Sequence, residues 1–169
     1  WLNPLNAPGR RDDNPRGTQP AAMAGLLIIA HAPLASALRA VGAHVYPAVS
    51  IQTLDVPPDA RIEAIEEQAR ELLNLVRDPE ALILVDVYGA TPAKVAASLA
   101  DGLQVRAVTG VNVSMLWRAM CYRAETLDVL VDRAVDGATQ GVMRLGATPP
   151  QNQSIKSTED DQVHTHHQQ

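Results

Sequence analysis

The sequence predicts an α/β fold: a doubly wound, mainly parallel four-stranded sheet in the order 2-1-3-4 with helices on both faces. Strand and helix patterns alternate along the chain, which is typical of right-handed β-α-β connections in a parallel sheet. Hydrophobic residues make up 46% of the 169 residues, yet the chain has no Phe and aromatic residues make up 3%. The core must therefore be aliphatic, which suits buried parallel strands.

The first half of the fold consists of two strand–helix units. The run AGLLIIA (24–30) predicts the first strand, and PLASALRAVGAHV (33–45) predicts the helix that follows it. AVSIQTLDV (48–56) predicts the second strand, which two prolines end. In residues 59–78 the aliphatic side chains recur at helical spacing, so we expect an amphipathic helix there.

The second half continues the alternation and ends in two helices. ALILVDV (81–87) predicts the third strand and TPAKVAASLADG (91–102) the next helix. LQVRAVTGV (103–111) predicts the fourth strand. Helices are expected over SMLWRAMCYRA (114–124) and over 125–145.

Both ends of the chain differ in composition from the middle. Residues 1–22 are rich in Pro, Gly, Asn and charge, and we expect a disordered N-terminal extension; residues 148–169 read as a disordered polar tail. Acidic residues before the first apolar run argue against a secretory signal. The folded domain is therefore expected over residues 23–147.

Charge and cysteine content exclude several classes of protein. The formal net charge of −5 provides no basic footprint for nucleic acid, and no apolar run approaches the length of a membrane span. The single Cys121 cannot form an internal disulfide, which fits a reducing compartment. We expect a cytoplasmic protein that meets a membrane transporter only through its partners.

Two polar residues stand where ligands bind in such a sheet. His31 follows the first strand and Asp86 ends the third, and in the order 2-1-3 these carboxyl ends flank the switch point. A carboxylate that binds one ring nitrogen leaves the other as a nucleophile. Thr91, as N-cap, and Pro92, at the first position, begin a helix whose N-terminus can hold an anion. From these residues alone, a phosphoryl-carrying histidine and a structural loop histidine both remain open.

Three longer stretches carry a family resemblance. LLIIAHAPLASAL (26–38), LILVDVYGATPAKVAASLA (82–100) and VRAVTGVNVSMLWRAM (105–120) resemble the signature stretches of mannose-type enzyme IIA. This family is the component of the phosphoenolpyruvate-dependent sugar phosphotransferase system (PTS) that is phosphorylated on histidine. The resemblance covers residues 24–147, nearly all of the predicted domain.

The resemblance implies a role for each matching residue. His31 takes the place of the phosphorylated nucleophile, Asp86 that of the carboxylate that orients it, and Thr91 that of a hydroxyl residue near the phosphoryl group. Ala32 and Ala90 stand where the family often has Gly, so both loops are expected to be stiffer here. The remaining residues expected to bind are Ala32, Tyr88, Gly89, Ala90, Pro92, Gly110, Val111 and Asn112.

The resemblance also implies a reaction and its partners. His31 would accept a phosphoryl group from phospho-HPr and pass it to a IIB component, so the chain would act as a phosphotransferase component. No metal ion or organic cofactor is implied. Because only a short tail follows the predicted domain, we expect the acceptor to be a separate IIB protein or a regulator.

The sequence argues against two other functions of this fold class. A receiver-type domain would need an acidic pair where Ala30 and His31 stand, and a flavin binder would need a hydroxyl-rich loop there. Two alternatives remain open, namely the phosphocarrier subunit of a dihydroxyacetone kinase and a purely regulatory binding protein.

The sequence also suggests an assembly. Met115, Leu116, Trp117 and Met120 give one helix much large apolar surface, and residues 125–132 have strand as well as helix character. The resembled family forms homodimers in which a segment of this region crosses to the other subunit. We therefore expect a homodimer held by residues 115–135, with a possible extra swapped edge strand.

Overall fold

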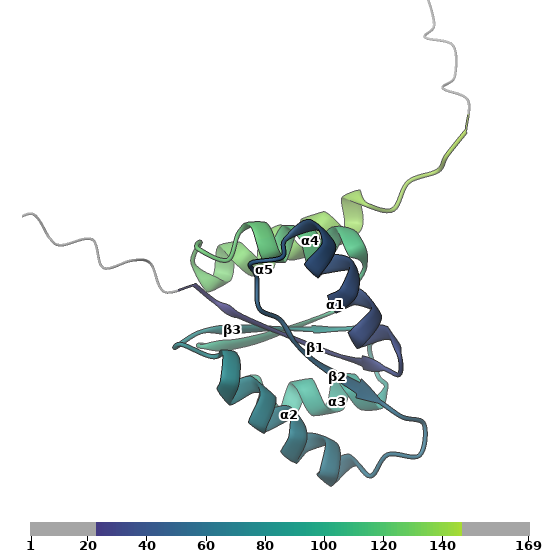
Figure 1. Cartoon of the computed structure of the whole chain (residues 1–169), viewed down its shortest axis with the longest axis vertical. Coiled ribbons are helices and arrows are strands. Elements are labelled where there is room, and N and C mark those ends of the chain that lie inside the picture. Colours follow the sequence, from purple (N-terminus) through teal and green to yellow (C-terminus); the bar gives the residue numbers. More distant parts are fainter. Residues whose placement is uncertain (1–22, 147–169) are drawn as a thin grey trace, which may run out of the picture.

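The computed structural model describes residues 23–146, which form a four-stranded parallel sheet between two layers of helices (Figure 1). The strands are β1 (Gly25–His31), β2 (Gln52–Val56), β3 (Ala81–Val85) and β4 (Val105–Thr109). Their order is β2-β1-β3-β4, so the predicted fold class and strand order are confirmed. The expected tails over 1–22 and 148–169 lie outside the described residues.

The helices divide between the two faces of the sheet (Figure 1). One face is covered by α1 (Leu34–Val45), α4 (Val113–Cys121) and α5 (Leu127–Gln140). The other is covered by α2 (Ile62–Val76) and α3 (Thr91–Leu99). Each layer has its own aliphatic core against the sheet, as the composition predicts.

The central strand β1 shows how side-chain alternation places the histidine. Leu26, Ile28 and Ala30 pack toward α1, α4 and α5, whereas Leu27 and Ile29 pack toward α2 and α3. All five are fully buried because both faces of the strand are covered. His31 ends this strand as its first exposed residue, and the two-residue period puts it on the side of α2 and α3.

Two predicted boundaries shift because turns replace regular structure. The second strand was expected from residue 48, but the N–H of Val49 donates to the carbonyl of Tyr46 (3.1 Å), and β2 begins at Gln52. The helix expected from residue 59 begins at Ile62, because the N–H of Ala60 donates to the carbonyl of Pro57 (3.2 Å) in a turn.

The predicted cap of α3 is wrong by one residue. Ala90, with extended backbone (φ −89°, ψ 175°), is the N-cap, and its carbonyl accepts the N–H of Lys94 (3.1 Å). Thr91 is therefore the first helical residue and Pro92 the second. The backbone turns into the helix earlier than the side-chain preference for Thr at the N-cap indicates.

The strand alternative for residues 125–132 is also wrong. Leu127, Leu130 and Ala134 are buried at helical spacing in α5, and residues 23–146 contain no fifth strand. The apolar side chains assigned to α4 are likewise mostly internal: Met115, Leu116 and Met120 are buried, because α4 packs on the sheet between α1 and α5.

Candidate active site

His31 and Asp86 meet at the carboxyl edge of the sheet, as predicted. His31 ends β1, and Asp86 directly follows β3, the strand that pairs with β1. The ring nitrogen Nδ1 of His31 lies 2.6 Å from Oδ2 of Asp86, and the backbone N–H of His31 donates to the same oxygen (2.9 Å). The carboxylate thus holds both the ring and the backbone of the histidine.

The environment of Asp86 keeps its carboxyl group ionised. Burial alone would raise the pKa of Asp86, but hydrogen bonds from the backbone and ring of His31 and from the N–H of Val87 (2.8 Å) lower this pKa below its ordinary value. An ionised carboxylate can only accept hydrogen bonds, so Nδ1 of His31 carries the proton of the pair. In the neutral imidazole, the tautomer with the proton on Nδ1 has its lone pair on Nε2.

Exposure differs between the two side chains in a way that suits chemistry with a partner. The side chain of His31 is 49% exposed, whereas that of Asp86 is 11% exposed. The imidazole ring is therefore accessible, while the carboxylate that binds it is largely shielded from water. Shielding strengthens the interaction between the ring and the carboxylate.

The loop after β4 holds the backbone next to Asp86. The N–H of Gly110 donates to the carbonyl of Asp86 (3.0 Å), and the N–H of Val111 donates to the carbonyl of Val85 (2.9 Å). Gly110 has φ +85°, a conformation that glycine adopts without steric cost. These predicted site residues therefore act on the site through their backbone.

Asn112 belongs to the same loop, but its side chain serves the helices. Its Oδ1 accepts the N–H of Met115 (2.8 Å) as the N-cap of α4, and its Nδ2 donates to the carbonyl of Ala138 in α5 (3.1 Å). Both polar atoms of the side chain are thus used within the fold. A direct contact of Asn112 with a ligand remains a prediction.

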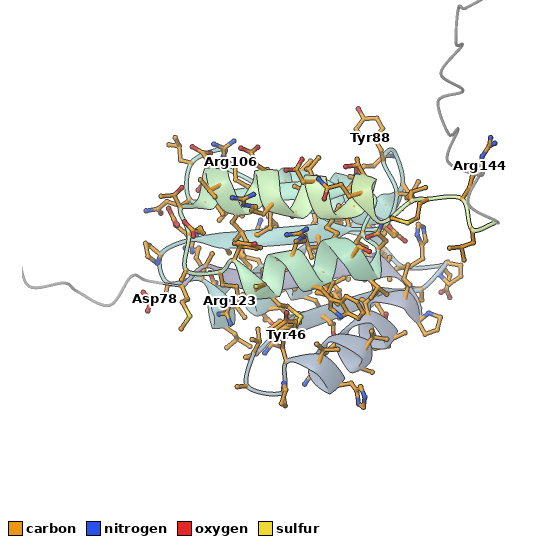
Figure 2. All side chains as sticks on the ribbon, turned by 90° about the horizontal axis from the view of Figure 1, so that it is seen from above. Tyr46, Asp78, Tyr88, Arg106, Arg123 and Arg144 are labelled. Carbon is orange, nitrogen blue, oxygen red and sulfur yellow. The ribbon has the colours of Figure 1, made fainter. Side chains whose placement is uncertain are left out.

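The loop from Asp86 into α3 brings a second functional element to this edge. Gly89 turns the chain with φ +85°, and Tyr88 projects outward with 86% of its surface exposed (Figure 2). The first N–H groups of α3 have no partner within the helix, and the helix dipole favours an anion there. Since α3 has no acidic residue in its first turn and Ala90 offers no side-chain cap, this N-terminus stays open to an anion.

A pocket of about 270 Å³ lies beside this loop, between α3 and the ends of β3 and β4. The pocket is lined mostly by small apolar side chains, which include Ala93 and Ala107, together with Tyr88 and Thr109. A larger pocket of about 570 Å³ lies against α4 and α5 and includes neither His31 nor Asp86. In residues 23–146 no group of three or more His, Cys, Asp or Glu side chains could hold a metal ion.

One residue near the site was missed in the sequence. Asp55, in β2, accepts the N–H of Ser36 at the start of α1 through Oδ1 (3.2 Å). The available signal was an acidic residue at the carboxyl end of an otherwise apolar strand, the same kind of position that Asp86 occupies.

The comparisons with known proteins give a match to one protein family. The family model EIIA-man, described as "PTS system fructose IIA component", matches residues 25–135. None of the curated proteins matches the chain. Within residues 23–146, every helix is too short or too polar to cross a bilayer.

Several solved structures share the fold at low identity. The chain is similar to phosphotransferase system component EIIA from Streptococcus agalactiae (20% identity, TM-score 0.66, covering 72% of this chain and 97% of that one). It is also similar to the mannose/sorbose specific IIA subunit from Enterococcus faecalis (19% identity, TM-score 0.69, covering 75% of this chain and 98% of that one). A PTS IIA protein associated with the fucose utilization operon of Streptococcus pneumoniae is similar at 21% identity with a TM-score of 0.63, covering 75% of this chain and 96% of that one. Because the family model matches well over half of the chain, the protein belongs to the EIIA-man family of IIA components, which serve phosphoryl transfer in the PTS.

Proposed function

We propose that His31 accepts a phosphoryl group from phospho-HPr on Nε2 and passes it to a IIB component. The observation that carries this proposal is the 2.6 Å pair of His31 Nδ1 and Asp86 Oδ2 on an exposed ring, because a carboxylate bound to Nδ1 leaves Nε2 as the ring nitrogen that can attack in the neutral imidazole. Membership of the EIIA-man family also supports the proposal, because the family serves phosphoryl transfer and the family model covers all the site residues.

In the transfer, each bond that forms is matched by a bond that breaks. The lone pair of His31 Nε2 forms the new N–P bond while the N–P bond of the donor histidine breaks, and that electron pair returns to the donor nitrogen. The His31 ring becomes positive, and Asp86 stabilises this charge through Nδ1–H. Thr91 and the first N–H groups of α3 would bind the phosphoryl oxygens. Acceptance and donation use the same geometry in opposite directions.

The surface around His31 suits a protein partner. Leu34, Val87 and Tyr88 flank the histidine and are exposed to 39%, 50% and 86%. Val41 and Val45 are further exposed apolar residues on α1. Aromatic and aliphatic side chains at the centre of a surface patch are typical of protein interfaces. This supports HPr and IIB, rather than a small molecule, as donor and acceptor.

The alternatives rank below this function. The description of the matching family names the PTS and not dihydroxyacetone kinase, and this favours phosphoryl transfer within the PTS. With this role we also propose a cytoplasmic location, where the soluble PTS phosphocarriers work. A regulatory protein that keeps its phosphoryl group would still be labelled on His31 but would not pass the label to IIB.

Phosphorylation with purified enzyme I, HPr and phosphoenolpyruvate tests the proposal directly. The chain should take up one acid-labile, base-stable phosphoryl group, and His31→Ala should take up none. His44→Ala is the matched control, because His44 is an exposed histidine at the other end of α1. Stoichiometric labelling of His31→Ala would contradict the site assignment.

A further inference from the structure

The helix that follows the histidine does not cap its own N-terminus. Helix α1 begins at Leu34 after Pro33, which makes no side-chain cap, and its first turn has no acidic residue. The first N–H groups of a helix need acceptors from outside it. Because α1 directly follows His31, whatever supplies these acceptors also controls the loop that carries the nucleophile.

Asp55 supplies an acceptor from a neighbouring strand. Its Oδ1 accepts the N–H of Ser36 (3.2 Å), and Asp55 lies opposite Ala30 in the β1–β2 register. The adjacent backbone strengthens the connection, because the N–H of Ala32 donates to the carbonyl of Val56 (3.0 Å). The end of β2 therefore fixes the start of α1 relative to the end of β1.

The His31–Ser36 segment is thus held at both ends by carboxylates. Asp86 binds the N–H and ring of His31, and Asp55 binds the N–H of Ser36. Of the residues between them, Ala32 to Leu34 are exposed, whereas Ala35 is fully buried in the core. Loss of either carboxylate should release one end of the segment.

We propose that Asp55 is a positioning residue for phosphoryl transfer: by anchoring the first turn of α1 from β2, it keeps the His31 ring on Asp86. The inference rests on the proposed function for its role in transfer, but the anchoring itself is a property of the free protein. Transfer rates are sensitive to sub-ångström placement of the reacting atom, so a loosened loop should slow transfer without removing any reacting group.

Two substitutions at this position separate anchoring from charge. Asp55→Ala removes the acceptor, and we expect transfer from phospho-HPr about tenfold slower. The proton resonance of the Nδ1–H···Oδ2 hydrogen bond of His31 should broaden in the same variant. Asp55→Asn keeps an acceptor oxygen for the Ser36 N–H, so both the rate and the resonance should stay near those of the wild type.

Asp101 provides a matched control. It also accepts backbone N–H groups through its carboxylate, from Leu103, Gln104 and Val105 (2.8 Å each), but at the amino end of β4, the edge of the sheet opposite His31. Asp101→Ala should lower stability while leaving the His31 resonance and the transfer rate unchanged. If Asp55→Ala does not fold, Ser36→Pro removes the donor instead, in a first turn where proline is tolerated.

The outcomes separate this inference from the proposed function. The anchoring role would be overturned if Asp55→Ala kept the wild-type transfer rate and His31 resonance. It would also be overturned if Asp101→Ala slowed transfer and broadened the resonance as much as Asp55→Ala does. An Asp55→Asn variant as impaired as Asp55→Ala would overturn it as well. If the wild type takes no label at all, the proposed function fails, and the resonance of the unphosphorylated protein still decides the anchoring role.

Discussion

At the residue scale, the proposed phosphoryl transfer depends on which ring nitrogen of His31 carries the proton. The carboxylate of Asp86 accepts from Nδ1 of His31, so an uncharged replacement that also donates hydrogen bonds would no longer select this tautomer. Asp86→Asn keeps the size of the side chain. We therefore expect it to fold while slowing transfer by more than tenfold, which corresponds to about 1.4 kcal/mol of barrier. Stopped-flow or quench-flow transfer from phospho-HPr measures this, and a wild-type rate would remove Asp86 from the mechanism.

The same residue predicts a pH dependence of stability. The pKa of Asp86 is lowered from 3.8 in the fold, so the folded state binds a proton less readily than the unfolded chain. The stabilisation is complete above the unfolded value and is lost as pH falls through the lower, folded value. Wild type should therefore lose free energy of unfolding below pH 3.8 more steeply than Asp86→Asn. Urea unfolding at neutral pH and at several acidic pH values gives both curves. Parallel curves would contradict the prediction. The pKa of Asp101 is also lowered, but Asp101 is present in both proteins, so its contribution cancels in the comparison.

At the element scale, the start of β1 is set by how closely it approaches α2. A Cβ atom added at Gly25 would overlap the backbone carbonyl of Val76, the last residue of α2. Backbone atoms cannot move aside as the end of a flexible side chain can. An added Cβ would therefore force β1 and α2 apart. A shift of β1 would also displace His31, which ends this strand.

Gly25→Ala should therefore destabilise the protein by about 2 kcal/mol, within the range for overpacked sites. Chemical denaturation measures the loss. Gly146→Ala is the control, because an added Cβ there meets no atom within 4 Å. Equal stability of the Gly25 variant and the wild type would show that α2 can shift without cost.

At the scale of the whole molecule, the exposed apolar residues beside α4 and α5 still point to a partner. Three of the four α4 residues expected to drive dimerisation are buried in the chain's own core, which leaves Trp117, 41% exposed. The segment after α5 adds Val142, Met143 and Leu145, exposed to 77%, 71% and 94%. The proposed homodimer therefore uses Trp117 and the segment after α5 rather than the full length of 115–135.

Trp117→Glu should shift a dimer toward the 18.1 kDa monomer, because it places a charge in the apolar contact. Sedimentation velocity at micromolar concentration measures the shift. Leu75→Glu is the control, since Leu75 is 72% exposed but lies on α2, in the other helix layer. A wild-type protein that sediments as a monomer would contradict the homodimer.

Local pattern was sufficient to predict most of the elements. The aliphatic runs of β1 and β3 and the amphipathic spacing of α2 appear in the sequence because each depends only on neighbouring residues and on burial. The start of β2, the cap of α3 and the helical state of residues 127–132 depend on turns and on packing between elements. A single-sequence pattern does not contain that information.

The sequence by itself determined the alternation of strands and helices and put His31 and Asp86 at the carboxyl ends of two strands, because these features depend on local hydrophobic pattern. The order 2-1-3-4, which brings those two strand ends together, is one of the common doubly wound orders, and the structure confirms it. Only the tertiary structure decided which atoms meet there. It showed that Gly110 and Val111 act through their backbone, that Asn112 serves α4 and α5, and that Asp55 reaches Ser36 from β2. Such contacts join residues distant in sequence, and their geometry is set by the packing of whole elements.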